Sequence, residues 1–252
     1  GQDAAGIVTE SNGRLNLMKN NGSVSDVFTQ ENIVSLKGNI GIGHVRYPTS
    51  GGRRSCEAQP LYTNFPYGIA IAHNGNLTNT KELAQRMQRS YRHVNTDSDS
   101  EILLNVFADE LQRRQLANIT PDDIFDSVNI LMRKCKGAFA VVMLINRLGL
   151  LAFRDPHGIR PLCFGSRETP TGSEDSFFFN LSTFFQHSLC FCYRYRLCGG
   201  LGERGDRRPG PLQRVHPGAR RACRRGHLCV TQRSDLHPRA VCSQYYVHAM
   251  HL

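Results

Sequence analysis

Apolar and polar positions alternate in an ordered way over residues 5–165, where short apolar runs are separated by polar turns and by longer segments with apolar residues at helical spacing. Such agreement between neighbouring segments is typical of a folded domain. The apolar runs predict strands at 6–9, 15–19, 40–45, 68–73, 138–145 and 149–153.

Three helical segments stand between these strands. The first opens at Asn79 with Glu82 three residues later, and the second opens at Ser98 with Glu101 in the same relation. This spacing predicts a capping box at each start, in which side chains and backbone N–H groups satisfy one another.

The third helical segment has Thr120 as its cap and Pro121 at its first helical position. Asp122 and Asp123 follow near the positive end of the helix dipole. Paired helices between pairs of strands predict layered sheets covered by helices, an α+β class.

The ordered pattern stops after about Ser176. The following stretch is rich in Arg, Gly, Pro, His and Cys and contains no isoleucine or lysine. Its apolar residues follow neither a helical nor a strand period. We therefore expect a domain over 1–176 and an irregular tail over 177–252. Our hypothesis is that this tail is non-native, from an out-of-frame or intron-derived translation, and an unbroken reading frame would refute it.

Charge and cysteine follow the same division. Of the net charge of +10, most belongs to the tail, because 18 Lys+Arg face 15 Asp+Glu up to Gly165. Cys56, Cys135 and Cys163 are scattered in the front part, as in a reducing compartment. No apolar run approaches the ~20 residues of a membrane span, and Gly1 begins neither a signal peptide nor a natural start. These features favour a cytosolic fragment.

Four segments of the ordered part carry candidate chemistry: GQDAAGIV (1–8), GIGHVRYPTSG (41–51), IAHNGNLTN (71–79) and NTDSDSEILLN (95–105). They supply a strand-end cation, Arg46, a turn amide and glycine, Asn74 and Gly75, and a carboxylate at a helix start, Asp99. An amino-acid ligand needs such a set: the cation for a carboxylate, the acid for an ammonium group, and the amide and glycine N–H for an oxyanion. Taken singly, each has a plain structural reading as a surface charge, a hairpin turn or a helix cap.

Together the segments resemble the glutaminase half of the amidophosphoribosyltransferase family, and fungal members in particular. The resemblance runs from Gly1 to about Arg167 and includes FRDPHGIRPLCFGSR (153–167). It implies a four-layer αββα fold of amidotransferases with an N-terminal nucleophile, truncated here at its N-terminus because the first strand would precede residue 1.

The resemblance also implies roles for the residues. Arg46 and Thr49 would bind the α-carboxylate of glutamine, Asp99 its α-ammonium group, and Asn74 and Gly75 would form the oxyanion hole. In the family a cysteine at the mature amino terminus is the nucleophile. We expect that cysteine to be absent from this chain, which alone would then have no glutaminase activity.

Neighbouring residues in the same segments have structural interpretations. His44 and His73 are expected to be hydrogen-bonded structural histidines, and Asp97 to be solvated or capping. The three front cysteines are interpreted as structural or incidental thiols, and the Asp155 segment as a tight loop with Arg154 and Arg160 as partners.

Other readings stay open at this stage. Another amidotransferase of the same superfamily, of the asparagine synthetase or glucosamine-6-phosphate synthase type, shares an arginine, an NG turn and an acid. A different class is an inert fragment whose basic tail binds nucleic acid through phosphate contacts alone. Zinc binding is disfavoured, because the tail cysteines form no C-x₂-C pair.

The resemblance adds expectations about the whole protein. It places the reaction at the first committed step of purine synthesis, where ammonia from glutamine is transferred to phosphoribosyl pyrophosphate. No cofactor is expected in this chain, Mg²⁺ belongs with the phosphoribosyltransferase domain that it lacks, and no cysteine matches a ligand of the iron–sulfur cluster found in some members. The full-length family is expected to be a cytoplasmic homo-oligomer without specific nucleic-acid or membrane partners.

Overall fold

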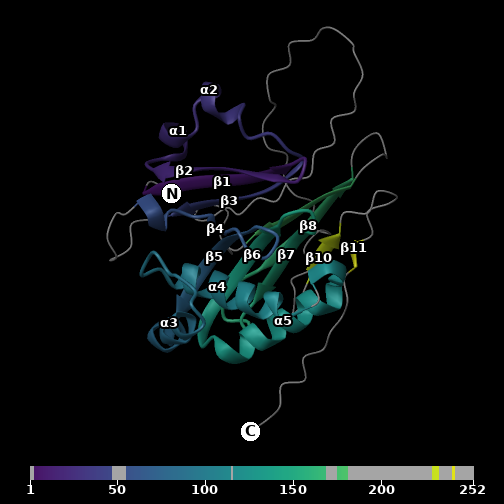
Figure 1. The fold of residues 1–252 in the computed structure, drawn as a ribbon. Helices are drawn as coiled ribbons and strands as arrows, with labels where there is room; N and C mark the ends of the chain where they lie inside the picture. Colours follow the sequence, from purple (N-terminus) through teal and green to yellow (C-terminus); the bar gives the residue numbers. More distant parts are fainter. Residues whose placement is uncertain are drawn as a thin grey trace.

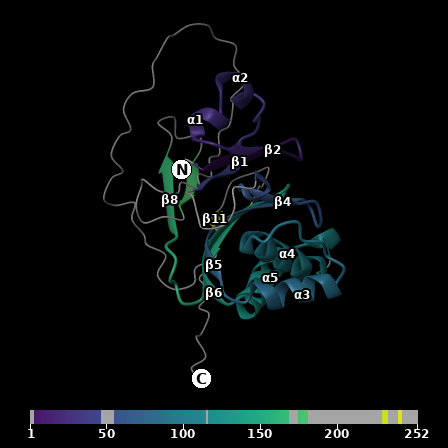
Figure 2. The same ribbon diagram turned by 90° about the vertical axis from the view of Figure 1, so that its left-hand side faces the viewer.

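Two antiparallel sheets stacked face to face form the middle of the structure, and helices lie on their outer sides (Figure 1). The computed structural model describes residues 3–46, 55–114, 116–168, 175–180, 229–232 and 240–241. Figure 2 shows the layers from the side, with α1 and α2 beyond one sheet and α3 to α5 beyond the other. The expected αββα layering is confirmed.

The smaller sheet has the strand order β2-β1-β3. Its strands are β1 (Ala4–Ser11), β2 (Arg14–Asn21) and β3 (Ile40–Arg46). β1 pairs with both neighbours, so that Val8 lies opposite Leu17 on one side and Ile42 on the other. The sequence pattern predicts all three strands. Two one-turn helices, α1 (Val24–Val27) and α2 (Gln30–Ile33), follow β2 and were not expected.

The larger sheet has the order β11-β10-β7-β6-β5-β4. Three of its strands were expected: β5 (Ile69–Leu77), β6 (Gly137–Ile145) and β7 (Gly149–Arg154). The edge strand β4 (Leu61–Thr63) is three residues long, too short for its period to be visible. A separate two-stranded sheet pairs β8 (Cys163–Glu168) with β9 (Asp175–Asn180).

Side chains of the larger sheet alternate between two cores. Large residues such as Phe139, Met143 and Phe153 face the helices, whereas small ones such as Ala70 and Ala140 face the smaller sheet. A strand buried on both faces reads as a continuous apolar run, which is why GAFAVVMLI carries no polar alternation. The site at one end of the sheets therefore rests on a closely packed support.

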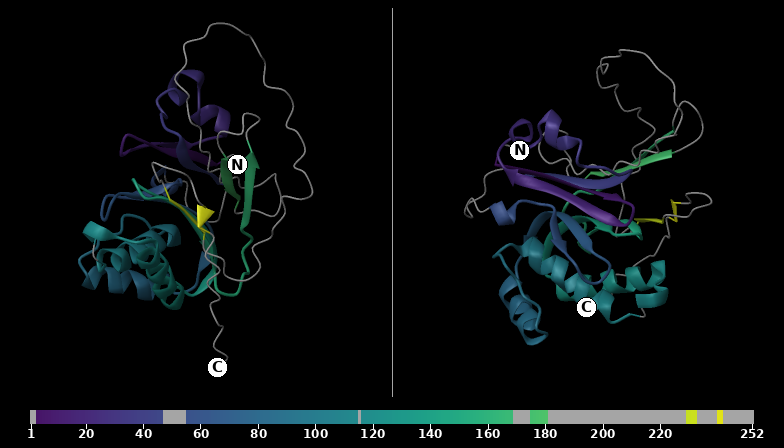
Figure 3. Two further views of the ribbon diagram at one scale, coloured as in Figure 1. Left: turned by 90° about the vertical axis from the view of Figure 1, so that its right-hand side faces the viewer. Right: turned by 45° about the horizontal axis from the view of Figure 1, so that its top comes forward.

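Three longer helices cover the outer face of the larger sheet. They are α3 (Thr80–Arg89), α4 (Asp99–Gln112) and α5 (Pro121–Lys134). The middle helix, α4, contacts both of the others and the sheet, and is buried from Ser100 to Leu111. Figure 3 shows this helical layer from two further directions. None of the helices in the described ranges is long and apolar enough to cross a bilayer.

The helix starts are correct, but two capping boxes are not. Asn79 makes no cap bond; its side chain instead accepts from the Lys136 N–H at 2.9 Å and donates to the Lys134 carbonyl at 2.9 Å. These tertiary bonds tie α3 to the end of α5, so they compete with the local cap.

At the start of α4, Ser98 accepts from the Ser100 N–H at 3.3 Å, one residue earlier than predicted. The Glu101 carboxylate turns to the preceding loop, where it accepts from the N–H groups of Asn95 (2.9 Å) and Thr96 (2.7 Å). By contrast, α5 starts at Pro121 with Thr120 as its cap, as predicted, and a complete capping box joins Thr120 and Asp123.

Some strands lie where the sequence pattern indicated none. β9 crosses the boundary placed at residue 176. β10 (Cys229–Gln232) pairs antiparallel with β7, and β11 (Ala240–Val241) pairs with β10. Most of the expected tail, including five of its six cysteines, lies outside the described residues.

Candidate functional site

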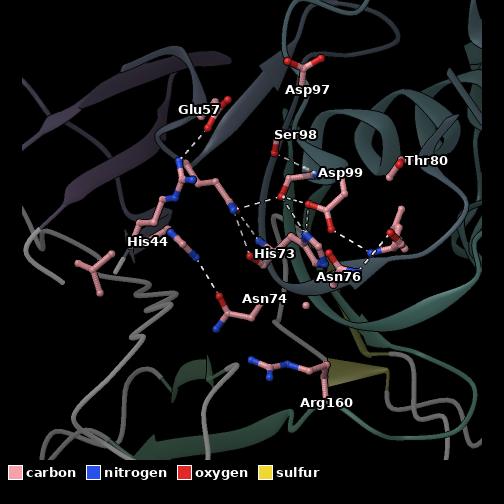
Figure 4. A pocket seen from close by; sticks show the side chains of 16 residues that line it. His44, Glu57, His73, Asn74, Asn76, Thr80, Asp97, Ser98, Asp99 and Arg160 are labelled. Atoms are coloured by element: carbon pink, nitrogen blue, oxygen red, sulfur yellow. Dashed lines mark hydrogen bonds and ion pairs between the residues drawn. The ribbon is translucent and has the colours of Figure 1, made fainter. Parts of the chain in front are cut away.

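A pocket of about 560 Å³ opens where β3 and β5 end beside the start of α4 (Figure 4). Arg46, Asn74, Gly75 and Asp99, which come from three segments far apart in the sequence, all line it. The structure thus brings together four of the five residues selected from the sequence. The fifth, Thr49, lies outside the described residues.

Arg46 is the last residue of β3, and its side chain is 17% exposed. Its Nη1 donates to Glu57 Oε2 at 3.1 Å. Glu57 stands in the one-turn segment Ser55–Glu57 and also lines the pocket. This ion pair holds the guanidinium at the pocket wall, where its planar fork suits a carboxylate of a ligand.

Asn74 and Gly75 lie in β5, paired with Ala140 and Phe139 of β6. Gly75 has a φ of 151°. A Cβ at this position would stand 2.1 Å from the Ala138 carbonyl oxygen. The sequence NG predicts a turn, but here it continues the strand, and glycine is required because two backbones approach closely.

Asp99 is the first residue of α4, and its side chain is 21% exposed. Its Oδ2 accepts from the Leu77 N–H at 3.0 Å, and its Oδ1 lies 3.8 Å from His73 Nδ1. The bond to Leu77 fixes the carboxylate against the end of β5. A carboxylate so placed beside the pocket suits an ammonium group of a ligand.

A buried network centred on His73 supports this wall. Gln59 accepts from the His73 N–H at 2.7 Å and donates to the His73 carbonyl at 3.1 Å. His73 Nδ1 bonds the Ser100 hydroxyl at 2.8 Å. Burial lowers the pKa of His73; the Asp99 carboxylate opposes this shift, and Arg160 adds to it. His73 is therefore neutral and structural, as expected.

His44 has a similar environment on β3. It is 6% exposed, and its Nε2 lies 2.9 Å from Asn74 Oδ1. Burial lowers the pKa of His44 to about 4, against the effect of its bond with Asn74. The interpretation of His44 as a hydrogen-bonded histidine is confirmed.

The sequence did not single out Glu57, Gln59 or Arg160 as pocket residues. Glu57 and Gln59 belong to the connection between β3 and β4, which has no period of its own. Arg160 reaches the pocket because its loop is built around Asp155, which is fully buried. The Asp155 carboxylate accepts from the N–H groups of His157 (3.1 Å), Ile159 (3.0 Å) and Arg160 (3.0 Å). The DPHGIR motif was the available signal, and it identified the loop but not the pocket.

The remaining sequence candidates lie away from the chemistry or at its rim. Asp97 lines the pocket and is exposed, as expected for a solvated acid. Cys135 is buried, and burial raises the pKa of its thiol to about 12, as suits a structural thiol. Cys56 and Cys163 are exposed. Among the described residues, no group of three or more His, Cys, Asp or Glu is arranged to hold a metal ion.

The lowered pKa of His44 predicts a pH dependence of stability. In the unfolded chain this imidazole takes up a proton near pH 6.5, but in the folded chain only near pH 4. Between these values the unfolded state binds more protons, so the free energy of unfolding should decrease as pH falls, by about 3 kcal/mol in total. Urea unfolding at several pH values from 7.5 to 4 measures this loss.

The matched control for this prediction is His44→Gln, which keeps an N–H donor and removes the titration. Its free energy of unfolding should fall less steeply over the same range. Equal slopes for the two proteins would contradict the assignment of this pH dependence to His44.

Comparisons with known proteins agree on one family. The family described as "Glutamine amidotransferase domain" matches residues 49–180. Amidophosphoribosyltransferase of Pseudomonas aeruginosa is 55% identical over 175 residues, and that of Saccharomyces cerevisiae is 51% identical over 177. Each match covers 69% of this chain and 35% of the relative. These identities do not separate fungal from bacterial relatives.

A solved structure leads to the same fold. Glutamine phosphoribosylpyrophosphate amidotransferase from B. subtilis, complexed with ADP and GMP, matches with a TM-score of 0.54 and 30% identity. That match covers 66% of this chain and 34% of the solved chain. The chain thus spans about a third of the length of the relatives that it matches.

Proposed function

Because the chain belongs to the family of glutamine amidotransferase domains, we propose that its pocket binds L-glutamine and serves the release of ammonia from the glutamine side chain. The observation that carries this proposal is the meeting of Arg46, Asn74, Gly75 and Asp99 in one pocket. These residues provide one cation, one anion and an amide, the set that an amino acid with a carboxamide side chain requires.

Each group has a proposed role. Arg46, together with Thr49, receives the α-carboxylate, and Asp99 receives the α-ammonium group. When a thiolate adds to the carboxamide carbon, the carbonyl oxygen becomes an anion, and Asn74 and Gly75 donate hydrogen bonds to it. When that intermediate collapses, the amide nitrogen takes up the proton that the thiol gave up, the C–N bond breaks, and ammonia leaves; the thioester that remains is then hydrolysed by water to glutamate and the free thiol. None of the described residues lining the pocket is a cysteine, so the roles proposed for them are binding and stabilisation.

For the whole protein we propose the activity of its relatives, amidophosphoribosyl transfer. The support is the identity of 51–55% to proteins of that name. The acceptor would be phosphoribosyl pyrophosphate and the product 5-phosphoribosylamine, at the first committed step of purine synthesis. A requirement for Mg²⁺, a homo-oligomeric assembly and a cytoplasmic location belong to the same proposal. This proposal extends to the whole protein, whereas the match covers 35% of each relative.

Binding of L-glutamine tests the proposed pocket directly. Titration calorimetry of the chain should detect L-glutamine, and Arg46→Ala should weaken binding by about tenfold to a hundredfold, because a charge-assisted bidentate contact is lost. Asp99→Asn should weaken it by a similar factor, since the amide keeps an acceptor for the Leu77 N–H but loses the charge.

The matched control is Arg86→Ala, which removes an arginine that is 51% exposed on α3 and paired with Glu82. Its affinity for L-glutamine should equal that of the wild type. Failure of the wild-type chain to bind L-glutamine, or equal weakening in Arg46→Ala and Arg86→Ala, would refute the proposed site.

A further inference from the structure

His44 and Asn74 form a buried contact between the two sheets. His44 is on β3 and Asn74 on β5, and Nε2 of one lies 2.9 Å from Oδ1 of the other (Figure 4). Both residues line the pocket, and His44 is 6% exposed. The contact therefore involves one of the two residues that are proposed to form the oxyanion hole.

The chemistry of the two side chains decides which atom donates. A neutral imidazole carries one N–H, and an amide oxygen can only accept. Nε2 of His44 lies 2.9 Å from Asn74 Oδ1, and an acceptor oxygen at that distance needs a donor opposite it, so the proton belongs on Nε2. Nε2–H then donates to Asn74 Oδ1.

This donation fixes the orientation of the Asn74 amide. The oxygen and nitrogen of a carboxamide point in different directions, and rotation by half a turn exchanges them. With Oδ1 held by His44, the two Nδ2 hydrogens point away from His44. In the exchanged orientation the oxygen would take their place and would repel an anion. His73 has no such role, since its Nδ1 bonds Ser100.

We propose that His44 is a positioning residue, which holds the Asn74 amide with its Nδ2–H donors toward the developing oxyanion. This inference rests on the proposed function, because it assigns a purpose to an amide that serves glutamine chemistry. His44 does not touch the reacting atoms and exchanges no proton with them. Its contribution is greatest for a tetrahedral anion and small for the planar carboxamide of glutamine.

Binding of two ligands distinguishes the tetrahedral anion from the planar carboxamide without requiring turnover. L-2-amino-4-phosphonobutanoate carries a tetrahedral anionic phosphonate in place of the carboxamide of L-glutamine. Calorimetry of His44→Leu should show about tenfold or more weaker binding of the phosphonate, with the Kd for glutamine within about threefold of wild type. His44→Gln, whose Nε2 stands near the position of the imidazole Nε2, should retain phosphonate binding, and His44→Asn should not.

A double-variant cycle identifies the route of the effect. Asn74→Ala should weaken phosphonate binding at least as much as His44→Leu, and the double variant should be no weaker than Asn74→Ala, because His44 acts through Asn74. Losses that add, or an equal loss for both ligands in His44→Leu, would overturn the positioning role. Absence of glutamine binding by the wild type would overturn the proposed function itself.

An independent readout needs neither ligand nor variant. ¹⁵N NMR of the wild-type chain reports which ring nitrogen carries the proton, and His44 is expected to show Nε2–H with an unprotonated Nδ1. The Nδ1–H tautomer would overturn the inference even if glutamine binds, because Asn74 would then have to present its nitrogen to His44.

Discussion

Gly75→Ala is expected to lower the free energy of unfolding by about 3 to 5 kcal/mol. The added Cβ would stand 2.1 Å from the Ala138 carbonyl oxygen and 2.7 Å from the Phe139 Cα, both backbone atoms of the paired strand β6. A φ of 151° is in addition unfavourable for any residue with a side chain. The strand pair must open to admit the methyl group, so stability and the pocket wall are lost together. Urea unfolding at pH 7.5 measures the change.

The control for this substitution is Gly43→Ala, in strand β3 of the smaller sheet. There the added Cβ would meet Ile7 at 3.4 Å and the Gly6 carbonyl oxygen at 3.5 Å, which are ordinary contacts. Its free energy of unfolding should change by less than about 1 kcal/mol. If the two variants are equally stable, the close approach of β5 and β6 does not require glycine.

Asp155→Ala is expected to cost about 3 kcal/mol or more. The carboxylate is fully buried and accepts from three N–H groups of its own loop and, at 3.3 Å, from that of Phe139 in β6. Alanine leaves these donors without a partner, so the loop that carries Arg160 to the pocket should lose its shape. Both the midpoint of thermal unfolding and the affinity for L-glutamine should fall.

Asp155→Asn is expected to have an intermediate effect on stability. The amide keeps one oxygen, which can still accept from the N–H groups of His157 and Ile159. Its NH₂ group replaces Oδ2, however, and cannot accept from the Arg160 N–H. Its stability should lie between those of wild type and alanine. As a surface control, Asp126→Ala removes an acid that is 61% exposed and 3.6 Å from Arg114, and should change stability by no more than about 0.5 kcal/mol. Similar losses at both aspartates would show that burial of Asp155 is not the cause.

The sequence pattern predicted most of the strands of the two stacked sheets and the three longer helices. The first three strands, β5 to β7 and the helices α3 to α5 were predicted in place, because each carries apolar residues in a run or at a spacing that is visible in the sequence. The capping boxes at Asn79 and Glu101 were wrong for the opposite reason. Each polar side chain found a tertiary partner, and no local rule includes such partners.

The candidate site divides along the same line. Arg46, Asn74, Gly75 and Asp99 stand in motifs that together resemble a known glutaminase domain, so their meeting in one pocket could be expected. Gln59 and Glu57 could not be found in this way, because their importance comes from contacts with β5 and β3 that the chain makes only when folded. The pair Asn74–Gly75 also predicted a turn, but in the structure it pairs with β6 and continues the strand.

The side chains of β6 that face the helices are larger than those that face the smaller sheet, and this difference has a consequence for folding. On β6, Phe139, Val141 and Met143 face the helices, while Ala140 and Val142 face the other sheet. A slip of one residue would force the phenyl ring into a space built for a methyl group and leave a void under α4. A misaligned hairpin thus gains little by docking, whereas the correct one gains from both sides. The side chains of β6 thus favour the register in which the pocket residues of β5 come together.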